Sequence, residues 1–399
     1  MNRRDRLVDV LVVGAGPAGL ALAARLAAAG AGRVEVLERE DAAGGAPRHC
    51  HHRGFGRPPL PGLSGPAYAR RAVAAAVGAG AVLRTGVTAT GWSGPLTLET
   101  TSPAGLERIT ARAVVLATGA RERPRSARLV PGSRPAGVFT TGELQRSVHP
   151  HGRPVGRRAV VVGAEPVARH AVRTLRRAGT EVAAMLTEHP RGTAVPGVAL
   201  LTATTVTELR GRGRLTGVAV RHEDGRSGVI ACDTVVFTGD WIPDHELARR
   251  GGVPLDPGTR GPSVDPAFRT TQPGVFAVGN ALRGIEPAAT AAAEGAAAAP
   301  PLLAHLAGTP WPGRGPALLV RPPLAWVTPN HLTAPAAGPL LLRSAEPLTA
   351  PVVEVTQDGR PLWRHRFPTR VSPYRSLRLP PGWTTRVDRA GGPVEVGTA

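Results

Sequence analysis

One glycine-rich turn near the start of the chain constrains the fold more than any other feature. An apolar run from Val8 to Val13, typical of a buried strand, leads into GAGPAGLALAARLAAAG, whose Ala- and Leu-rich part predicts a helix ending near Gly30. A second strand-like segment, RVEVLERE, ends at Glu38, nineteen residues after Gly19. This order of strand, glycine turn, helix and strand ending in an acid predicts a Rossmann-type dinucleotide site.

Each chemical role that such a site requires has a residue here. Gly14 permits the tight turn, Gly16 lets the backbone approach a pyrophosphate, and Gly19 permits close packing of helix on strand. The helix N-terminus offers unpaired N–H groups to phosphate oxygens. Glu38 can accept hydrogen bonds from the hydroxyls of a ribose.

Three more segments extend this pattern along the chain. AVVLATGA is a strand that runs into Thr118 and Gly119, and TTQPGVFAVGN is a strand that ends in Gly279 and Asn280, before an Ala-rich helix. From Pro312 the chain changes to short strands separated by prolines, with a hairpin predicted at the Asp-Gly pair in VVEVTQDGRPLW. This pattern of short strands and prolines predicts a small all-β domain at the C-terminus.

A second strand–turn–helix–strand unit spans residues 157–188, but its turn reads GAEPVA. Gly163 keeps the first glycine, whereas Glu165 replaces the middle one. A carboxylate 4 Å from a phosphate costs about 4 kcal/mol at an effective dielectric of 20. Glu188, by contrast, follows Ala168 by twenty residues, where a ribose-binding acid belongs. Two interpretations stay open: a weak NAD(P) site that uses Gly163 and Glu188, or a Rossmann shell retained for packing.

Composition excludes several other classes of protein. The net charge is +20 and every basic residue is arginine, but the arginines are scattered without a nucleic-acid-binding motif, so we expect a solvated basic surface and no nucleic-acid partner. No run of 18 apolar residues is free of charges and helix breakers, so we expect no membrane span and a cytoplasmic protein. Cys50 and Cys232 form no C-x-x-C motif.

The stretch GGAPRHCHHRGFG gathers four adjacent residues, three His and one Cys, that can bind metals or carry redox chemistry. Adjacent residues of an extended loop point to opposite sides, so at most two of His49, Cys50, His51 and His52 could share an ion. No second ligand cluster is visible in the sequence, and we therefore predict no metal site.

Taken together, these motifs resemble the pyridine nucleotide–disulfide oxidoreductase superfamily, flavoproteins with two dinucleotide-binding domains. The resemblance covers about residues 7 to 308 and implies FAD as the cofactor. It implies that Arg39 and Gly45 lie beside the adenosine and pyrophosphate, that Thr118 and Gly119 close the pocket, and that the helix after Asn280 points at the flavin. The FAD contacts implied are Gly14, Gly16, Ala18, Gly19, Glu38, Arg39, Gly45, Thr118, Gly119, Gly279 and Asn280.

Departures from the superfamily pattern are equally informative. Disulfide reductases of this superfamily carry a cysteine pair after the GG doublet or in the second unit, and this chain has neither. The chain most resembles the branch that includes the α-type subunits of amine, opine and hydroxyproline dehydrogenases, through the texture of residues 44–52 and 238–249. Many of those subunits end in a cysteine-rich iron–sulfur region, where this chain has its β-rich tail. Asn280 stands where the superfamily usually has Asp, which FAD binding should tolerate.

The resemblance also gives the HCHH loop a role, because the segment after the GG doublet lies along the isoalloxazine in this superfamily. Arg48, His49 and His52 are therefore candidate catalytic residues beside the flavin. A cation near N1 would stabilise reduced flavin, and an imidazole near N5 could move a proton. The alternative is that these residues only hold the loop and contact a phosphate.

We therefore expect an α/β protein with two nested Rossmann-like domains and a small C-terminal β domain. The predicted segments are 1–125 and 241–310 for FAD, 126–240 for NAD(P), and 311–399 for the β domain. The function expected is that of an FAD-dependent oxidoreductase, not a disulfide reductase. Its electrons would come from NAD(P)H, a small organic substrate or a partner subunit. The protein could form oligomers. The alternative is a non-catalytic flavin-binding scaffold or sensor subunit of a larger dehydrogenase complex.

Overall fold

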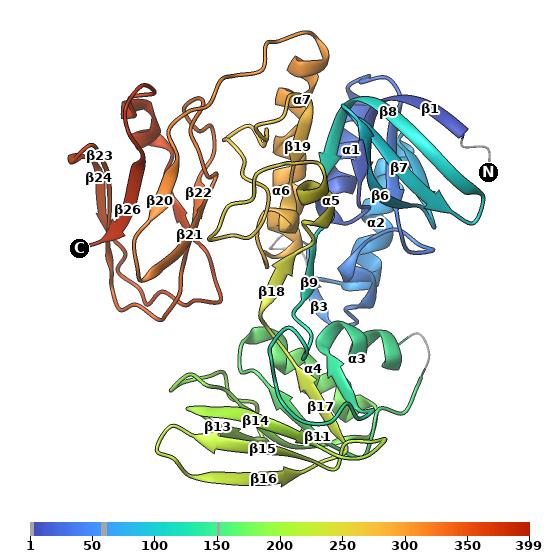
Figure 1. Cartoon of the computed structure of the whole chain (residues 1–399), viewed down its shortest axis with the longest axis vertical. Helices are drawn as coiled ribbons and strands as arrows, with labels where there is room; N and C mark the ends of the chain where they lie inside the picture. Colours follow the sequence, from blue (N-terminus) through green and yellow to red (C-terminus); the bar gives the residue numbers. More distant parts are fainter. Residues whose placement is uncertain (1–3, 57–61, 150–151) are drawn as a thin grey trace. The chain divides into compact units, whose positions relative to one another are not determined.

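A computed structural model describes residues 4–56, 62–149 and 152–399, and the chain divides into two compact units (Figure 1). Unit one comprises residues 1–48, 53–120 and 242–399, and unit two comprises 49–52 and 121–241. Both units contain a parallel sheet, and the C-terminal part of unit one is all β. The predicted fold class, two nested Rossmann-like domains followed by a β domain, is confirmed.

The main sheet of unit one has the strand order of a dinucleotide-binding domain. Its parallel strands run β5-β2-β1-β8-β19, with β1 at the centre and the returning strand β19 paired to the end of β8. Strands β7 and β6 continue the sheet antiparallel from the first half of β8. The bounds are β1 Arg4–Val13, β2 Val34–Glu38, β5 Val82–Thr85, β6 Thr88–Gly94, β7 Thr97–Ser102, β8 Gly105–Leu116 and β19 Val275–Ala277.

Helices cover this sheet because its central strands are apolar on both faces. Val10 and Leu11 are fully buried, as a strand covered on both sides requires. Helix α1 (Pro17–Ala28) packs closely against α6 (Ala288–Ala297). The other elements of this part are α2 Gly65–Gly78, α5 Glu246–Arg250, α7 Ala299–Leu306, β3 Arg53–Phe55, β4 Leu63–Ser64 and the 3-10 turns Ala46–His49 and Gly279–Ala281.

Beyond α7, the chain forms two small antiparallel or mixed sheets around their own apolar core. Trp383, 1% exposed, lies in this core together with leucines and valines of both sheets. The hairpin predicted at the Asp-Gly pair is confirmed, since β23 and β24 flank it. The bounds are β20 Leu318–Val320, β21 Leu324–Thr328, β22 Leu340–Ser344, β23 Val352–Gln357, β24 Arg360–Arg366, β25 Leu377–Leu379, β26 Val394–Thr398 and the 3-10 turn Gly382–Arg386.

Unit two contains a five-stranded parallel sheet, in the order β10-β17-β11-β12-β13, and a three-stranded antiparallel sheet β14-β15-β16. The strands are β10 Val138–Thr140, β11 Arg158–Val162, β12 Glu181–Leu186, β13 Ala199–Leu201, β14 Thr204–Arg210, β15 Gly217–His222, β16 Ser227–Ala231 and β17 Thr234–Phe237. The helices are α3 Thr141–Val148 and α4 Pro166–Arg177. The chain passes from one unit to the other within two paired strands, β9 (Ala120–Glu122) and β18 (Trp241–Pro243).

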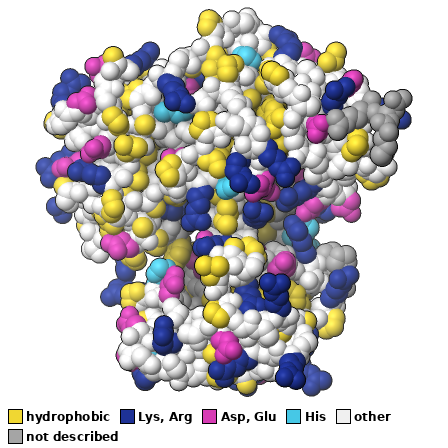
Figure 2. All heavy atoms as spheres, viewed as in Figure 1, with side chains coloured by type: hydrophobic (Ala, Val, Ile, Leu, Met, Phe, Trp, Pro, Cys, Tyr) yellow, Lys and Arg dark blue, Asp and Glu magenta, His cyan; other side chains and the backbone are white. Residues whose placement is uncertain are grey.

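The arginines on the face drawn in Figure 2 occupy dispersed positions. Figure 2 shows dark-blue side chains spread over the visible face and interspersed with magenta Asp and Glu side chains. Among the helices in the described part of the chain, none combines the length and the apolar character that crossing a bilayer requires.

Candidate functional site

The turn between β1 and α1 requires glycine at two positions for steric reasons. Gly14 has φ +110°, and a Cβ atom there would lie 2.3 Å from the carbonyl oxygen of Ala117. A Cβ on Gly19 would lie 2.1 Å from the carbonyl oxygen of Gly14. Both glycines therefore allow β1, α1 and the end of β8 to pack at their observed separation.

Gly16 differs from these two glycines because the space beside it is open. It is the N-cap of α1, and apart from its chain neighbours no atom of the described residues lies within 4 Å of the position that its Cβ would occupy. The first turn of α1 has no acidic residue, and no side chain caps it. Gly45 packs against this turn, since its Cβ would lie 2.8 Å from the Cα of Gly16. The helix N-terminus thus presents free N–H groups and a positive dipole end to an anion.

Glu38 is fixed at the carboxyl end of β2, beside this turn. One carboxylate oxygen accepts a hydrogen bond from the amide of Ala15 (3.2 Å), and the other accepts one from the amide of Glu40 (3.0 Å). The residue is 8% exposed. Because each carboxylate oxygen can accept more than one hydrogen bond, Glu38 keeps the capacity to bind a ribose diol.

Asp244 links the end of β8 to the segment after β2. Its carbonyl oxygen accepts a hydrogen bond from the Thr118 hydroxyl (2.6 Å), and its amide donates to the carbonyl of Gly119 (2.8 Å). Its carboxylate lies 3.1 Å from the guanidinium of Arg39. Three of the predicted FAD contacts are thus held by one residue that the sequence did not single out.

The returning strand β19 brings the last predicted segment to the same edge of the sheet. Gly279 has φ +70°, and its Cβ would lie 2.6 Å from the Cβ of Ala18. The Asn280 side chain donates to the carbonyl of Glu286 (3.1 Å) and accepts from its amide (2.9 Å). Gly279 therefore packs against the start of α1, and Asn280 organises the loop that follows.

A buried charge cluster, which the sequence did not predict, holds this loop from the C-terminal β region. Arg343 of β22 donates to Glu286 (2.7 Å) and to the carbonyls of Gly284 (3.2 Å) and Ile285 (3.0 Å). Ser376 also donates to the Glu286 carboxylate. The one signal available in the sequence is an arginine inside the apolar strand LLLRS.

A second arginine completes this cluster. Arg283 is fully buried and donates to Glu294 of α6. The guanidinium carbons of Arg283 and Arg343 lie 5.7 and 4.9 Å from the centre of the Trp326 ring, within cation–π range. The β region therefore anchors the segment that follows Gly279 and Asn280 through charges removed from water.

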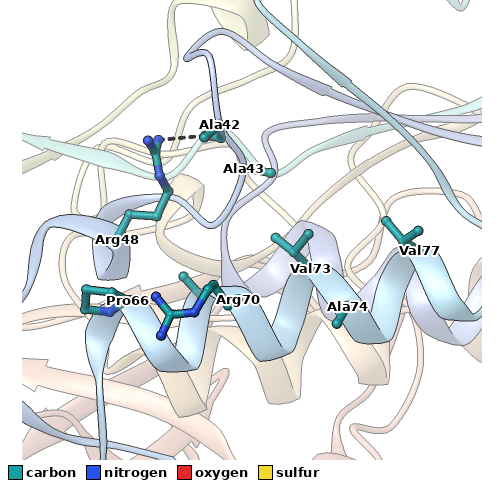
Figure 3. A pocket seen from close by; sticks show the side chains of 9 residues that line it. Ala42, Ala43, Arg48, Pro66, Arg70, Val73, Ala74 and Val77 are labelled. Atoms are coloured by element: carbon teal, nitrogen blue, oxygen red, sulfur yellow. Dashed lines mark hydrogen bonds between the residues drawn. The ribbon is translucent and has the colours of Figure 1, made fainter.

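Arg48, a predicted catalytic residue, is bound to acids of its own loop. Its guanidinium lies 2.7 Å from Glu40 and 3.5 Å from Asp41, and it donates to the carbonyl of Ala42 (2.6 Å). Figure 3 shows Arg48 beside the helix α2, where it lines a mostly apolar pocket of about 610 Å³ together with residues such as Arg70. Its role beside a flavin stays a prediction, as does that of His49.

The histidines that follow Arg48 make contacts within unit two. The rings of His52 and His170 stack with their centres 3.6 Å apart, and those of His51 and His149 stack at 4.1 Å. Burial lowers the pKa of His170 to about 4, so its imidazole is neutral at pH 7. Among the described residues, no three His, Cys, Asp or Glu side chains form a group that could hold a metal. The role of His52 beside a flavin stays a prediction.

Cys50 is expected to be unreactive at neutral pH, because burial and the nearby Glu122 raise the pKa of its thiol to about 11. Only the thiolate attacks an alkylating agent, so iodoacetamide should modify native Cys50 at pH 8 about a hundredfold slower than an ordinary cysteine. Mass spectrometry of the labelled peptide, with urea-unfolded protein as control, measures this rate. Fast labelling of the folded protein, or a mixed disulfide at Cys50, would contradict this expectation.

The turn between β11 and α4 has the same backbone path as the first turn, but a side chain occupies the space beside it. Gly163 donates to the carbonyl of Leu186 (2.8 Å) as Gly14 does to that of Leu37 (2.9 Å). A Cβ on Gly163 would lie 2.7 Å from an oxygen of Glu165, and one on Gly239 would lie 3.1 Å from its carboxyl carbon. The Glu165 carboxyl therefore covers the turn where a pyrophosphate would have to approach.

Glu165 is 8% exposed, and its Oε1 atom has no hydrogen-bond partner among the described residues. Burial raises the pKa of this carboxyl, and this effect outweighs the opposing effects of Thr238 and the Arg128 charge. A buried, incompletely paired acid at this position does not fit a dinucleotide phosphate.

The matching hydrogen bonds of Gly14 and Gly163 also show which residue of the second unit corresponds to Glu38. Since Leu186 corresponds to Leu37, the residue that corresponds to Glu38 is Thr187. Glu188 lies one residue further on and is exposed. Side chains of consecutive extended residues point to opposite sides, so Glu188 and Glu38 do not occupy equivalent positions.

The two parallel sheets and their glycine turns place the chain in the class of proteins that have two Rossmann-like domains. A family profile matches residues 8–295, and the chain belongs to the pyridine nucleotide-disulphide oxidoreductase family. The resemblance inferred from the sequence is thereby confirmed.

One curated relative matches about half of the chain. The chain is 29% identical over 219 residues to sarcosine oxidase subunit alpha of Rhizobium meliloti (strain 1021), which agrees with the predicted branch; the match covers 52% of this chain and 20% of that protein. Thus the match spans about a fifth of the length of that curated relative.

Solved structures share the fold. Thioredoxin reductase of T. acidophilum superposes with a TM-score of 0.62 at 24% identity, covering 75% of this chain and 98% of the other. L-proline dehydrogenase of P. horikoshii superposes with a TM-score of 0.57 at 19% identity, covering 78% and 58%.

Proposed function

We propose that this chain is an FAD-dependent oxidoreductase in which the flavin is the only redox centre. Membership of the family supports a flavin-dependent oxidoreductase. The first glycine turn carries the assignment to FAD, because α1 starts with an open, uncapped N-terminus beside a buried ribose-type acid. Bound FAD would supply reversible electron transfer.

In this proposal, the residues of the chain hold the cofactor and exclude water. The N-terminus of α1 at Gly16 binds the pyrophosphate, and Glu38 binds the adenosine ribose. Gly279 and Asn280 meet the ribityl–pyrophosphate region, Arg39 and Gly45 lie beside the adenosine and pyrophosphate, and Thr118 and Gly119 close the pocket. Arg48, His49 and His52 are the candidates for charge stabilisation and proton transfer.

A dithiol relay is not part of the proposal. The chain has two cysteines, neither of which is in a disulfide, and burial raises the pKa of each to about 11. At pH 7 both are thiols, so neither starts thiol–disulfide exchange readily. The proposed enzyme is therefore not a disulfide reductase, in spite of its family.

The electron donor that we propose is an organic substrate or a partner subunit. The second turn does not fit a nicotinamide dinucleotide, because Glu165 covers it and Thr187 replaces the ribose acid. The likeness to an alpha subunit of sarcosine oxidase supports a partner subunit.

Purified protein is expected to be yellow and to contain one non-covalent FAD per chain rather than FMN. Photoreduction should bleach the flavin, and a suitable acceptor should restore it. The visible spectrum, recorded anaerobically with a panel of amines, amino acids and acceptors, tests this. Folded protein that takes up no FAD would overturn the proposal; bound FAD that no donor or acceptor turns over would favour a scaffold subunit instead.

Glu165→Gly is expected to strengthen NADH binding. Wild-type protein should bind NADH with a Kd on the order of 1 mM or weaker, about −4 kcal/mol. The variant removes the buried carboxylate that opposes the pyrophosphate, so the Kd should fall about tenfold or more. Anaerobic titration of flavin reduction, or calorimetric titration of the full chain with NADH, measures the change in Kd.

Glu188→Gln is the matched control, because Glu188 is exposed and one residue out of register. We expect it to leave the Kd unchanged. Micromolar NADH binding by the wild type that weakens in Glu165→Gly would show that Glu165 is a contact for the nucleotide.

A further inference from the structure

A second cavity in unit one lies away from the dinucleotide turn. It has a volume of about 280 Å³ and is lined by residues 265–273 of the returning segment and by residues 311–333 of the C-terminal part. Thr270 and Pro273 of its wall precede β19, whereas Gly279 and Asn280 follow that strand. The cavity therefore opens at the opposite edge of the sheet from the proposed FAD contacts.

One wall of the cavity contains a buried acid, Asp265, whose charge is paired and hydrogen-bonded. Asp265 is 1% exposed, and its carboxylate accepts hydrogen bonds from the amides of Ala267 (2.9 Å) and Arg269 (3.0 Å). The Arg269 guanidinium lies 2.7 Å from the same carboxylate, and the Thr333 hydroxyl also donates to it. This wall is rigid and nearly neutral.

Two further polar side chains that line the cavity are Arg314, which is exposed, and His331. Arg314 lines the cavity and forms no ion pair with any acid among the described residues. His331 is 9% exposed, and its Nδ1 lies 3.4 Å from the Ser263 hydroxyl. Burial lowers the pKa of His331, so it is neutral at pH 7. If Nδ1 accepts from Ser263, the ring proton is on Nε2, which then is a donor.

Trp311 supplies an ordered apolar wall. Its indole N–H donates to the carbonyl of Thr270 (3.2 Å), and its ring packs edge-on against Phe276 with the ring centres 5.2 Å apart. The Arg269 guanidinium carbon lies 6.0 Å from the ring centre. The aromatic surface is thus fixed before any ligand arrives, which reduces the entropy cost of binding.

We propose that this cavity binds a small organic carboxylate. The formal charges of Arg269, Arg314 and Asp265 leave one positive charge in its wall, which matches a single carboxylate. A guanidinium pairs with a carboxylate through two parallel hydrogen bonds, and a neutral imidazole can add a third. The volume is at the small end of ligand pockets and suits one ring or a short chain against Trp311. This inference is independent of the proposed function.

Calorimetric titration of the full chain with benzoate tests the proposal. We expect saturable binding of one benzoate per chain, and binding of the neutral isostere benzamide at least tenfold weaker. Arg314→Gln should weaken benzoate binding at least tenfold. The matched control is Arg321→Gln, since Arg321 is a half-exposed arginine nearby in the chain that lies 3.8 Å from Glu395.

Thermal unfolding of each variant shows whether it is folded, and Trp311→Phe provides a second route if Arg314→Gln fails to fold. Trp311→Phe should also weaken benzoate binding, because the ring that fixes the apolar wall shrinks. Absence of benzoate binding, equal binding by Arg314→Gln, or equally tight binding of inorganic phosphate would each overturn the carboxylate site.

Discussion

Gly16→Asp is expected to yield folded protein that contains no FAD. A Cβ on Gly16 would have no atom of the described residues within 4 Å apart from its chain neighbours, so the substitution creates no steric clash at Cβ. Its carboxylate would instead lie at the N-terminus of α1, where it stabilises the helix and repels a pyrophosphate. At an effective dielectric of 20 and 4 Å, the repulsion is about 4 kcal/mol, or about a thousandfold in Kd.

Gly16→Asn is the matched control because it has the same shape without the charge. We expect it to weaken FAD binding much less than Gly16→Asp. Flavin content after gel filtration, the Kd of reconstituted FAD and the Tm of each apoprotein distinguish binding from folding. Gly16→Asp protein that binds FAD as tightly as the wild type would show that the cofactor is not held at this turn.

Arg343→Gln is expected to have the second largest effect, on stability and on FAD retention together. The substitution leaves the Glu286 carboxylate buried with Ser376 as its remaining side-chain donor among the described residues. Removal of one partner from a buried pair typically costs about 3–5 kcal/mol. Glu286 is hydrogen-bonded through its backbone to Asn280, so we also expect the Kd of FAD to rise about tenfold or more.

Two further variants separate the causes. Arg343→Lys keeps the charge but loses the fork that reaches two carbonyls, and it should be intermediate. Arg364→Gln breaks an exposed pair with Glu354 (2.9 Å) in the same β region and should change stability by less than about 1 kcal/mol. Loss of stability in Arg343→Gln with an unchanged FAD Kd would limit the cluster to a structural role.

Local signals in the sequence were sufficient for the elements around the first turn. The apolar run of β1, the glycines and the acid at the end of β2 are close in sequence, and their spacing is dictated by one supersecondary unit. The same holds for the hairpin of β23 and β24, where an Asp-Gly turn sets the register.

The second turn shows where spacing alone was insufficient. Glu188 has nearly the expected separation from Ala168, but the hydrogen bond from Gly163 to Leu186 places Thr187 at the equivalent position. A shift of one residue reverses the side of the strand that a side chain faces, and no pattern in the sequence fixes that shift.

Contacts between distant segments could not be predicted. Arg343 meets Glu286 across 57 residues, and Asp244 meets Arg39 across 205. Such pairs depend on tertiary packing and leave only weak traces, such as a charged residue within an apolar strand. For the same reason, no pattern in the sequence indicates that His52 stacks on His170.

The interrupted layout of unit one constrains the order in which the chain can fold during synthesis. Nearly all of unit two is one continuous stretch, residues 121–241, so it can fold while the ribosome is still translating the rest. The sheet of unit one needs β19, and the loop after Asn280 needs Arg343 from the last part of the chain. The FAD site proposed here is therefore assembled last, and truncation of the C-terminal part should leave a folded second unit beside an incomplete first one.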